Sequence, residues 1–227
     1  MDPSPPDARQ KALALNLDPA SYGTIAEIGG GQEVARWFFQ VGGAAGTVAK
    51  TISAYDMAVS DALQELRVLV LQHRLQALPA DVALGVPVER LGDTRSPTTT
   101  FFAFADTVAT RSYTHPEDGR GWVGIWFQTR PREDPSEILV HVNLLDSTTV
   151  LQQAALGVLG VNLIHGAFFH HARPDTLIGS LLDDLSRARL DVDMIRFSGP
   201  AFAGLDNRLM SLQLVEQGLT DAMRSAA

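Results

Sequence analysis

The chain contains no cysteine and only two lysines among its 18 basic residues. Without thiols it has no disulfide framework, no thiolate zinc site and no cysteine nucleophile. The acidic residues number 26, so the formal net charge is −8. Because neutralisation of phosphates dominates nucleic-acid affinity, this balance argues against nucleic acid as a partner.

The N-terminus lacks the features of a secretory signal. It reads MDPSPPDARQ, which is acidic and rich in proline, whereas a signal has a basic start and an apolar core. The most apolar stretch covers residues 150–169 and is long enough to cross a membrane. Gln152, Gln153, Asn162 and His165 interrupt it, so we expect a buried helix, no membrane partner and a cytoplasmic protein.

The composition, 45% apolar and 19% charged, is that of a globular protein. In the first part of the chain, apolar residues spaced by three or four predict helices. These helices cover residues 9–17, 32–40 and 47–71. Glycines at 29–31 and 42–43 separate them, so residues 1–75 are expected to form a helical N-terminal region. Residues 76–99 contain three prolines and are expected to form an irregular connector.

From residue 100 the pattern changes to the alternation that is typical of strands. Three strands separated by turn residues predict an antiparallel meander. They cover residues 100–110, 122–129 and 137–145. A buried helix, an amphipathic helix, a further strand and a C-terminal helix should follow, over residues 150–169, 174–186, 189–198 and 206–223. The expected fold class is therefore α+β, with residues 100–227 as an α+β domain.

Long strings in both halves of the chain are distinctive. They are LNLDPASYGTIAEIGGGQEVARWFFQVGGAAGTVAKTISAYDMAVSDA, FFAFADTVATRSY, GVNLIHGAFF, and DVDMIRFSGPAF with DNRLMSLQLVEQGLTDA. Together they resemble a widespread, uncharacterised bacterial family whose members carry inconsistent labels, including TonB-dependent receptor and nicotinate-nucleotide adenylyltransferase. The resemblance covers most of residues 13–62 and 100–222 and lapses across residues 63–98. It implies no established activity and no catalytic residue.

Neither label fits the residues. A TonB-dependent receptor needs a signal peptide and many barrel strands with an apolar outer band. An adenylyltransferase of that superfamily needs a T-x-G-H or H-x-G-H turn, and no histidine here follows a glycine in that pattern. Members of the family extend further at the C-terminus, so we expect this chain to lack the C-terminal part of a longer protein.

Two glycine-rich segments near the N-terminus are candidate ligand sites, because glycine lets the backbone approach a ligand and a following helix favours an anion. The segment from Glu27 to Gly31 is similar to the nucleotide loop of methyltransferases; the alternative is a kink between two helices. The segment 42–51 carries Lys50, but three residues separate this lysine from the last glycine, unlike a phosphate loop. Its alternative is a turn between closely packed helices.

A third glycine-rich segment, residues 198–208, leads from a strand through a loop into a helix. Arg208 could add a planar charge for a phosphate or carboxylate. The alternative is that Asp206 simply caps the helix. Taken together, the three segments give the candidate ligand-binding residues Gly29, Gly31, Gly46, Lys50, Ser198, Gly199 and Arg208.

Polar residues within the predicted strands are candidates for catalysis. Asp106 interrupts an apolar strand, and His141 is expected to face the same side as Asn143. On the last strand, Asp191 and Asp193 are expected to face the side opposite Arg196. A histidine beside an aspartate could transfer protons near neutral pH, so the candidate catalytic residues are Asp106, His141 and Arg196. The alternative is a sheet face that simply meets water.

The sequence identifies no cofactor and predicts no metal site, because His165 and His170 lie five residues apart on one helix. Three functional hypotheses remain. The first is that the protein binds or acts on a phosphorylated or nucleotide-like small molecule. The second is a non-catalytic interaction or scaffold protein, with an oligomer as one possibility. The third is a methyltransferase-like domain. Convergence of Asp106, His141 and Arg196 beside a glycine loop would favour an enzyme.

Overall fold

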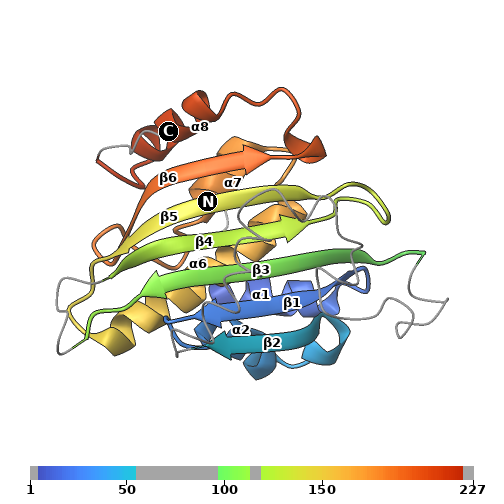
Figure 1. Cartoon of the computed structure of the whole chain (residues 1–227), viewed down its shortest axis with the longest axis horizontal. Coiled ribbons are helices and arrows are strands. Elements are labelled where there is room, and N and C mark those ends of the chain that lie inside the picture. The colour runs from blue at the N-terminus through green and yellow to red at the C-terminus, as the bar shows by residue number, and fades with distance from the viewer. Residues whose placement is uncertain (1–4, 55–96, 113–118, 222–227) are drawn as a thin grey trace.

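In the computed structural model, residues 5–54, 97–112 and 119–221 are described. Their strands form one six-stranded sheet in the order β2-β1-β3-β4-β5-β6 (Figure 1). The strands are β1 (Ser21–Ile28), β2 (Val48–Ala54), β3 (Thr100–Ala109), β4 (Arg120–Phe127), β5 (Ser136–Leu144) and β6 (Leu190–Ser198). β1 pairs in parallel with both β2 and β3, whereas all pairings from β3 to β6 are antiparallel.

Helices cover one face of this sheet and one of its edges. α1, α2 and α6 lie behind the sheet in the view of Figure 1, and α8 lies beyond β6. The helices are α1 (Ala8–Leu17), α2 (Glu33–Val41), α6 (Thr149–Phe169), α7 (Pro174–Ser180) and α8 (Asn207–Glu216), with short 3-10 turns at Ala44–Gly46 (η1) and Pro200–Phe202 (η4). The hydrophobic core lies between the sheet and α1, α2 and α6.

Local sequence explains where the helices begin and how closely they pack. Asp7 and Gln10 form a capping box at α1, and Thr148 caps α6. A Cβ atom at Gly160 of α6 would lie 2.3 Å from Val34 of α2, so glycine is required for this close contact. By length and composition α6 could cross a membrane, but 78% of its most apolar window is buried inside the protein. It is the central buried helix of an α+β fold.

The edge of the sheet at β6 is closed by side-chain and backbone hydrogen bonds. The Asn207 amide donates to the Phe197 carbonyl oxygen at 2.9 Å, and its own oxygen accepts from the Phe197 N–H at 2.7 Å. Further along, the Val192 N–H donates to the Leu219 carbonyl oxygen at 3.1 Å. These bonds occupy backbone groups of β6 that an additional strand would otherwise pair with.

The α+β class and the meander of β3, β4 and β5 are confirmed, but the expected all-helical N-terminal region is wrong. Residues 21–28 and 48–54 are strands, although the sequence pattern predicted a helix from residue 47 onward. β1 has no alternation because it is buried on both faces and paired on both edges, as interior parallel strands are. The second helix after the meander ends at Ser180, and the last described helix ends at Glu216.

The described residues on either side of 55–96 belong to the same sheet and the same core. β1 pairs with β3 along its whole length, from Ser21 opposite Thr100 to Ile28 opposite Thr107. Most of the expected connector, and the region where the family resemblance lapses, fall outside the described residues.

Candidate functional site

The loop between β1 and α2 has the backbone geometry that only glycine adopts readily. Gly29 has a φ of 87° and Gly31 a φ of 107°. Between them, a Cβ atom at Gly30 would lie 2.4 Å from the Leu156 side chain of α6. The loop lies at the carboxyl end of β1, between two parallel neighbours. Ligands of open α/β sheets bind at the carboxyl ends of parallel strands.

The amino end of α2 holds an internal anion. The Glu27 carboxylate, from the end of β1, accepts hydrogen bonds from the N–H groups of Val34 at 2.8 Å and Ala35 at 3.2 Å. The residue at the N-cap position, Gln32, makes no side-chain capping bond. Glu27 therefore takes the place of a helix cap, and its charge is favourable at the positive end of the helix dipole.

A second carboxyl group lies beside Glu27. Asp106 of β3 is directly opposite Glu27 in the register of the two parallel strands, so both side chains project toward the helices. Asp106 is fully buried, and its Oδ1 accepts from the Ile28 N–H at 3.3 Å. Among the residues that the structure describes, Asp106 Oδ2 has no hydrogen-bond partner.

Burial makes both carboxyl groups weak acids. It raises the pKa of Glu27 to about 7, although the N–H groups of Val34 and Ala35 act in the opposite direction. Burial, together with the charge of Glu27, raises the pKa of Asp106 well above its usual range. Burial therefore favours the neutral form of both carboxyl groups, and Glu27 changes charge close to neutral pH.

A cavity of about 540 Å³ runs along α2 from the end of this loop. Its lining residues are Gln32, Glu33, Ala35, Arg36, Phe39, Gln40 and Thr51. The Arg36 side chain is 61% exposed and lies 3.5 Å from Glu33, so the cation is only loosely paired. Glu33, Arg36 and Gln40 also line a second cavity of about 380 Å³ on the side of α2 that faces α6.

Lys50 and Gly46 do not join the glycine loop of β1. Lys50 lies in β2, opposite Thr24, and therefore points away from the face on which Glu27 lies. Gly46 belongs to η1, where a Cβ atom would lie 3.8 Å from the Asn16 carbonyl oxygen. The segment 42–51 thus leads into a strand, and the helix expected after it is wrong.

Ser198, Gly199 and Arg208 lie at the other end of the sheet, at the end of β6 and the start of α8. Gly199 packs against Ser136, whose Cα would lie 2.6 Å from an added Cβ atom. The Arg208 N–H donates to the Asp206 side chain at 2.9 Å. The cap that the sequence offered as an alternative is therefore present.

His141 and Asp193 form a buried pair on the sheet face opposite Asp106. His141 Nδ1 lies 2.5 Å from Asp193 Oδ1, and the Asn143 amide donates to Asp193 Oδ2 at 3.0 Å. Trp122 contacts the His141 ring edge-on. This arrangement orients the histidine as it would in acid–base chemistry.

Arg196 shares that face, contrary to the expected alternation. The register of β5 and β6 shifts between His141 and Val142, so β6 contains one extra residue at Asp193. Such a bulge reverses the parity of the strand and places Asp191 on the same face as Arg196. Arg196 lies 3.8 Å from Glu137. Asp106, His141 and Arg196 therefore do not converge, since Asp106 projects from the other face.

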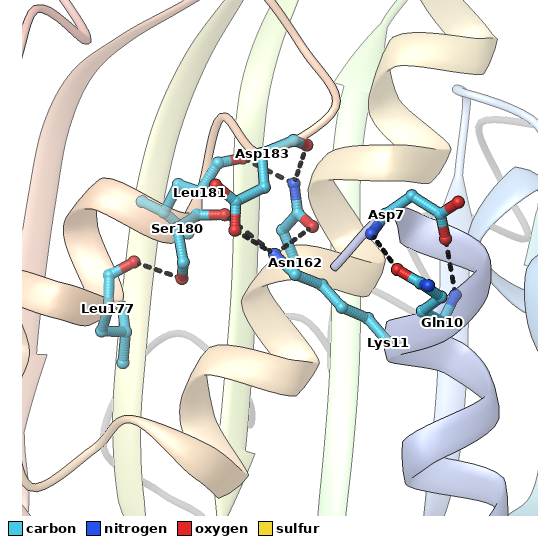
Figure 2. Close-up of polar contacts among 8 residues, drawn as sticks. All are labelled: Asp7, Gln10, Lys11, Asn162, Leu177, Ser180, Leu181 and Asp183. Atoms are coloured by element: carbon cyan, nitrogen blue, oxygen red, sulfur yellow. Dashed lines mark hydrogen bonds and ion pairs between the residues drawn. The ribbon is translucent and has the colours of Figure 1, made fainter. Parts of the chain in front are cut away.

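Sequence reasoning missed a buried lysine. The Lys11 side chain is fully buried, and its Nζ lies 2.6 Å from Asp183 Oδ2, 2.8 Å from Asn162 Oδ1 and 3.3 Å from the Ser180 carbonyl oxygen (Figure 2). Three acceptors match the three donors of an ammonium group. Asn162 in turn donates to the carbonyl oxygens of Leu181 and Asp183. This network joins α1 to α6 and to the segment after α7.

His165 of α6 and His170 just after it are shifted toward the neutral form. Burial, followed by the charge of Lys11, lowers the pKa of His165 to about 4. Burial also lowers the pKa of His170. No group of three or more potential metal ligands occurs within residues 5–54, 97–112 and 119–221.

Comparison with known proteins gives a distant similarity in structure. No family model and no curated protein matches the chain. The crystal structure of the competence/damage inducible protein CihA from Agrobacterium tumefaciens matches 72% of this chain and 97% of its own, with 14% identity and a TM-score of 0.42.

Proposed function

We propose that this protein is a cytoplasmic bacterial protein that binds a small phosphorylated or nucleotide-like molecule at the loop between β1 and α2. One observation carries the proposal: the first-turn N–H groups of α2 already hold an anion, the Glu27 carboxylate, at 2.8 and 3.2 Å. Backbone donors aimed at a carboxylate have the geometry and dipole direction that also suit a phosphate oxygen.

The surroundings of the loop supply the remaining contacts. Gly29 is exposed and has no side chain, so its backbone can approach a ligand closely, whereas Gly30 and Gly31 are buried against α6. Arg36 offers a cation that is loosely paired, and Phe39, which is 55% exposed, offers an apolar ring. A cavity of about 540 Å³ lies in the size range of small-molecule sites.

A thermal-shift screen with nucleotides and phosphorylated metabolites tests this function. Ligand at about one hundred times its Kd stabilises the folded protein by about 2.7 kcal/mol, which is readily seen as a rise in Tm. We expect Arg36→Gln to reduce that rise. Arg208→Gln is the matched control, because it removes an exposed arginine at the far end of the sheet. If no phosphorylated probe raises the Tm of the wild-type protein, the proposed function is wrong.

An interaction protein is the second candidate, and one observation favours it. Leu209, Leu212 and Val215 of α8 are 55%, 45% and 40% exposed, so one side of this helix presents apolar side chains to solvent. Light scattering and a pull-down test this alternative. A monomer that captures no partner would argue against it.

The methyltransferase-like hypothesis ranks third. In that interpretation, the acidic residue that precedes the glycines would be expected to contact the ligand. Here Glu27 is bonded to the helix that follows the loop. Including S-adenosylmethionine in the same thermal-shift screen tests the hypothesis. If this compound does not raise the Tm, the methyltransferase-like hypothesis is rejected, whatever the other probes do.

A further inference from the structure

We propose that Glu27 is an internal occupant of the anion site, which an incoming ligand anion replaces only as the pair of Glu27 and Asp106 takes up a proton. This inference rests on the proposed function and adds a regulation of the same site by pH. It predicts that an anion binds well at slightly acid pH and poorly at alkaline pH.

The first step of the argument is competition for the same donors. The N–H groups of Val34 and Ala35 both bond to Glu27, the last residue but one of β1, just before the glycine loop. Each N–H group donates one hydrogen bond. A phosphate oxygen can use these two donors only if the Glu27 carboxylate gives them up, and an ionised carboxylate left buried without them would be costly.

The second step is that Asp106 provides a place for a proton. Its Oδ2 is fully buried and has no partner in the described parts of the chain. Its Oδ1 lies 3.3 Å from the Ile28 N–H and 3.9 Å from the position of a Cβ atom on Gly30, so the carboxyl group lies beneath the glycine loop. Two carboxyl groups side by side in such a place favour a shared proton.

The third step is the charge around the pair. Glu33, at the start of α2, acts on Glu27, and Glu27 acts on Asp106. From β2, the register neighbour of Glu27 is the neutral Ser53; from β4, that of Asp106 is the apolar Val123. The residues of α6 nearest the loop, Gln153 and Leu156, are also uncharged. Among the residues that the structure describes, the charges that act on the pair are therefore negative.

An incoming anion adds a further negative charge to this group. It stabilises the protonated form of the pair, so binding and proton uptake are linked. The pKa of Glu27 is about 7 in the free protein and rises when the anion is present. The affinity is therefore constant below that value and falls as the pH rises above it. For uptake of one proton, the fall is about tenfold per pH unit.

The experiment measures the Kd of sulfate, which does not change charge near neutral pH, and of ADP, between about pH 6 and pH 8.5. Isothermal titration in buffers with different ionisation enthalpies also counts the protons that are taken up. We expect the wild-type protein to lose about tenfold in sulfate affinity per pH unit on the alkaline side.

Two variants and one control locate the linkage. Glu27→Gln removes the internal charge and should bind sulfate with no dependence on pH above neutrality. Asp106→Asn keeps an acceptor for the Ile28 N–H and a neutral side chain, so it should stay folded and shift the onset of the affinity loss. Glu33→Gln is the control, because it removes one nearby negative charge but not the internal occupant. It should raise the affinity at slightly acid pH, lower the pH at which the affinity begins to fall, and keep the slope.

Three outcomes would overturn the inference. If wild-type affinity for sulfate is the same at both ends of the pH range, or if Glu27→Gln keeps the wild-type slope, the linkage is wrong and the proposed function stands. If neither sulfate nor ADP binds at any pH, the proposed function itself fails. Should Glu27→Gln not fold, the wild-type profile and Asp106→Asn decide the matter.

Discussion

Two groups of buried charge, one at Lys11 and one at Glu27 and Asp106, differ in how well they are compensated. Lys11 has an acceptor for each of its donors and an opposite charge, Asp183, at 2.6 Å. Glu27 has two N–H donors but only negative charges beside it, and Asp106 has an oxygen with no partner in the described residues. A fully satisfied network fixes a structure, whereas an uncompensated pair is poised to change its protonation. This difference distinguishes the structural ion pair of Lys11 and Asp183 from the candidate functional pair of carboxyl groups, Glu27 and Asp106.

The largest expected effect comes from breaking the compensated network. Lys11→Met should destabilise the protein by about 3 to 5 kcal/mol, because it removes one partner of a buried ion pair and leaves Asn162 and Asp183 without a donor. Urea unfolding, followed by circular dichroism, measures the loss. A change below about 1 kcal/mol would show that Lys11 contributes no more than an exposed ion pair.

Packing of the glycine loop gives the next effect. Gly30→Ala places a Cβ atom 2.4 Å from Leu156 and should cost about 1 to 3 kcal/mol through overpacking. Gly46→Ala is the matched control, since its Cβ atom would approach no atom closer than 3.8 Å. Equal stability of the two variants in urea would contradict the close packing of the loop on α6.

The pair of Glu27 and Asp106 should lower the free energy of unfolding as the pH rises, opposite to the usual effect of carboxyl groups. Its carboxyl groups bind protons more strongly in the folded state, so the free energy of unfolding falls as the pH rises from about 4 toward 7. We expect Glu27 to account for about 1 to 3 kcal/mol of this fall. In Asp106→Asn the dependence should be weaker, and above neutral pH the variant should match or exceed the wild type. A wild-type stability that rises over this interval would contradict the shared proton.

The smallest effect is expected at the exposed cation of the candidate site. Arg36→Gln should change the free energy of unfolding by less than about 0.5 kcal/mol, because an ion pair at the surface contributes little. Chemical unfolding without ligand checks this value. A larger change would mean that Arg36 supports α2, and its effect on ligand binding would then have to be separated from its effect on folding.

The sequence pattern predicted the elements whose burial follows a simple periodicity or a long apolar run. Alternation identified β3, β4 and β5, and the long apolar run identified α6. β1 was missed because a strand buried on both faces does not alternate. β2, a half-exposed strand at the edge of the sheet, was missed because the sequence VAKTISA does not alternate between apolar and polar residues. The bulge at Asp193 was also missed, since a single extra residue in a strand leaves no mark in composition.

The candidate site was predicted in part. Gly29, Gly31 and Asp106 were selected because glycines precede a helix and because an acid interrupts an apolar strand. That Asp106 lies opposite Glu27 follows only from the pairing of β1 with β3, which are 79 residues apart at this position in the register. Lys11 and Asp183 are separated by 172 residues, so no spacing rule could have joined them.

The hydrogen bonds between Asn207 and Phe197 also bear on self-association. A single carboxamide supplies the donor and the acceptor that the outer edge of β6 would otherwise offer to another chain. Asn207 therefore helps to prevent a further strand from pairing with β6 at Phe197. Loss of its amide would leave the N–H and carbonyl oxygen of Phe197 without these partners at the edge of the sheet.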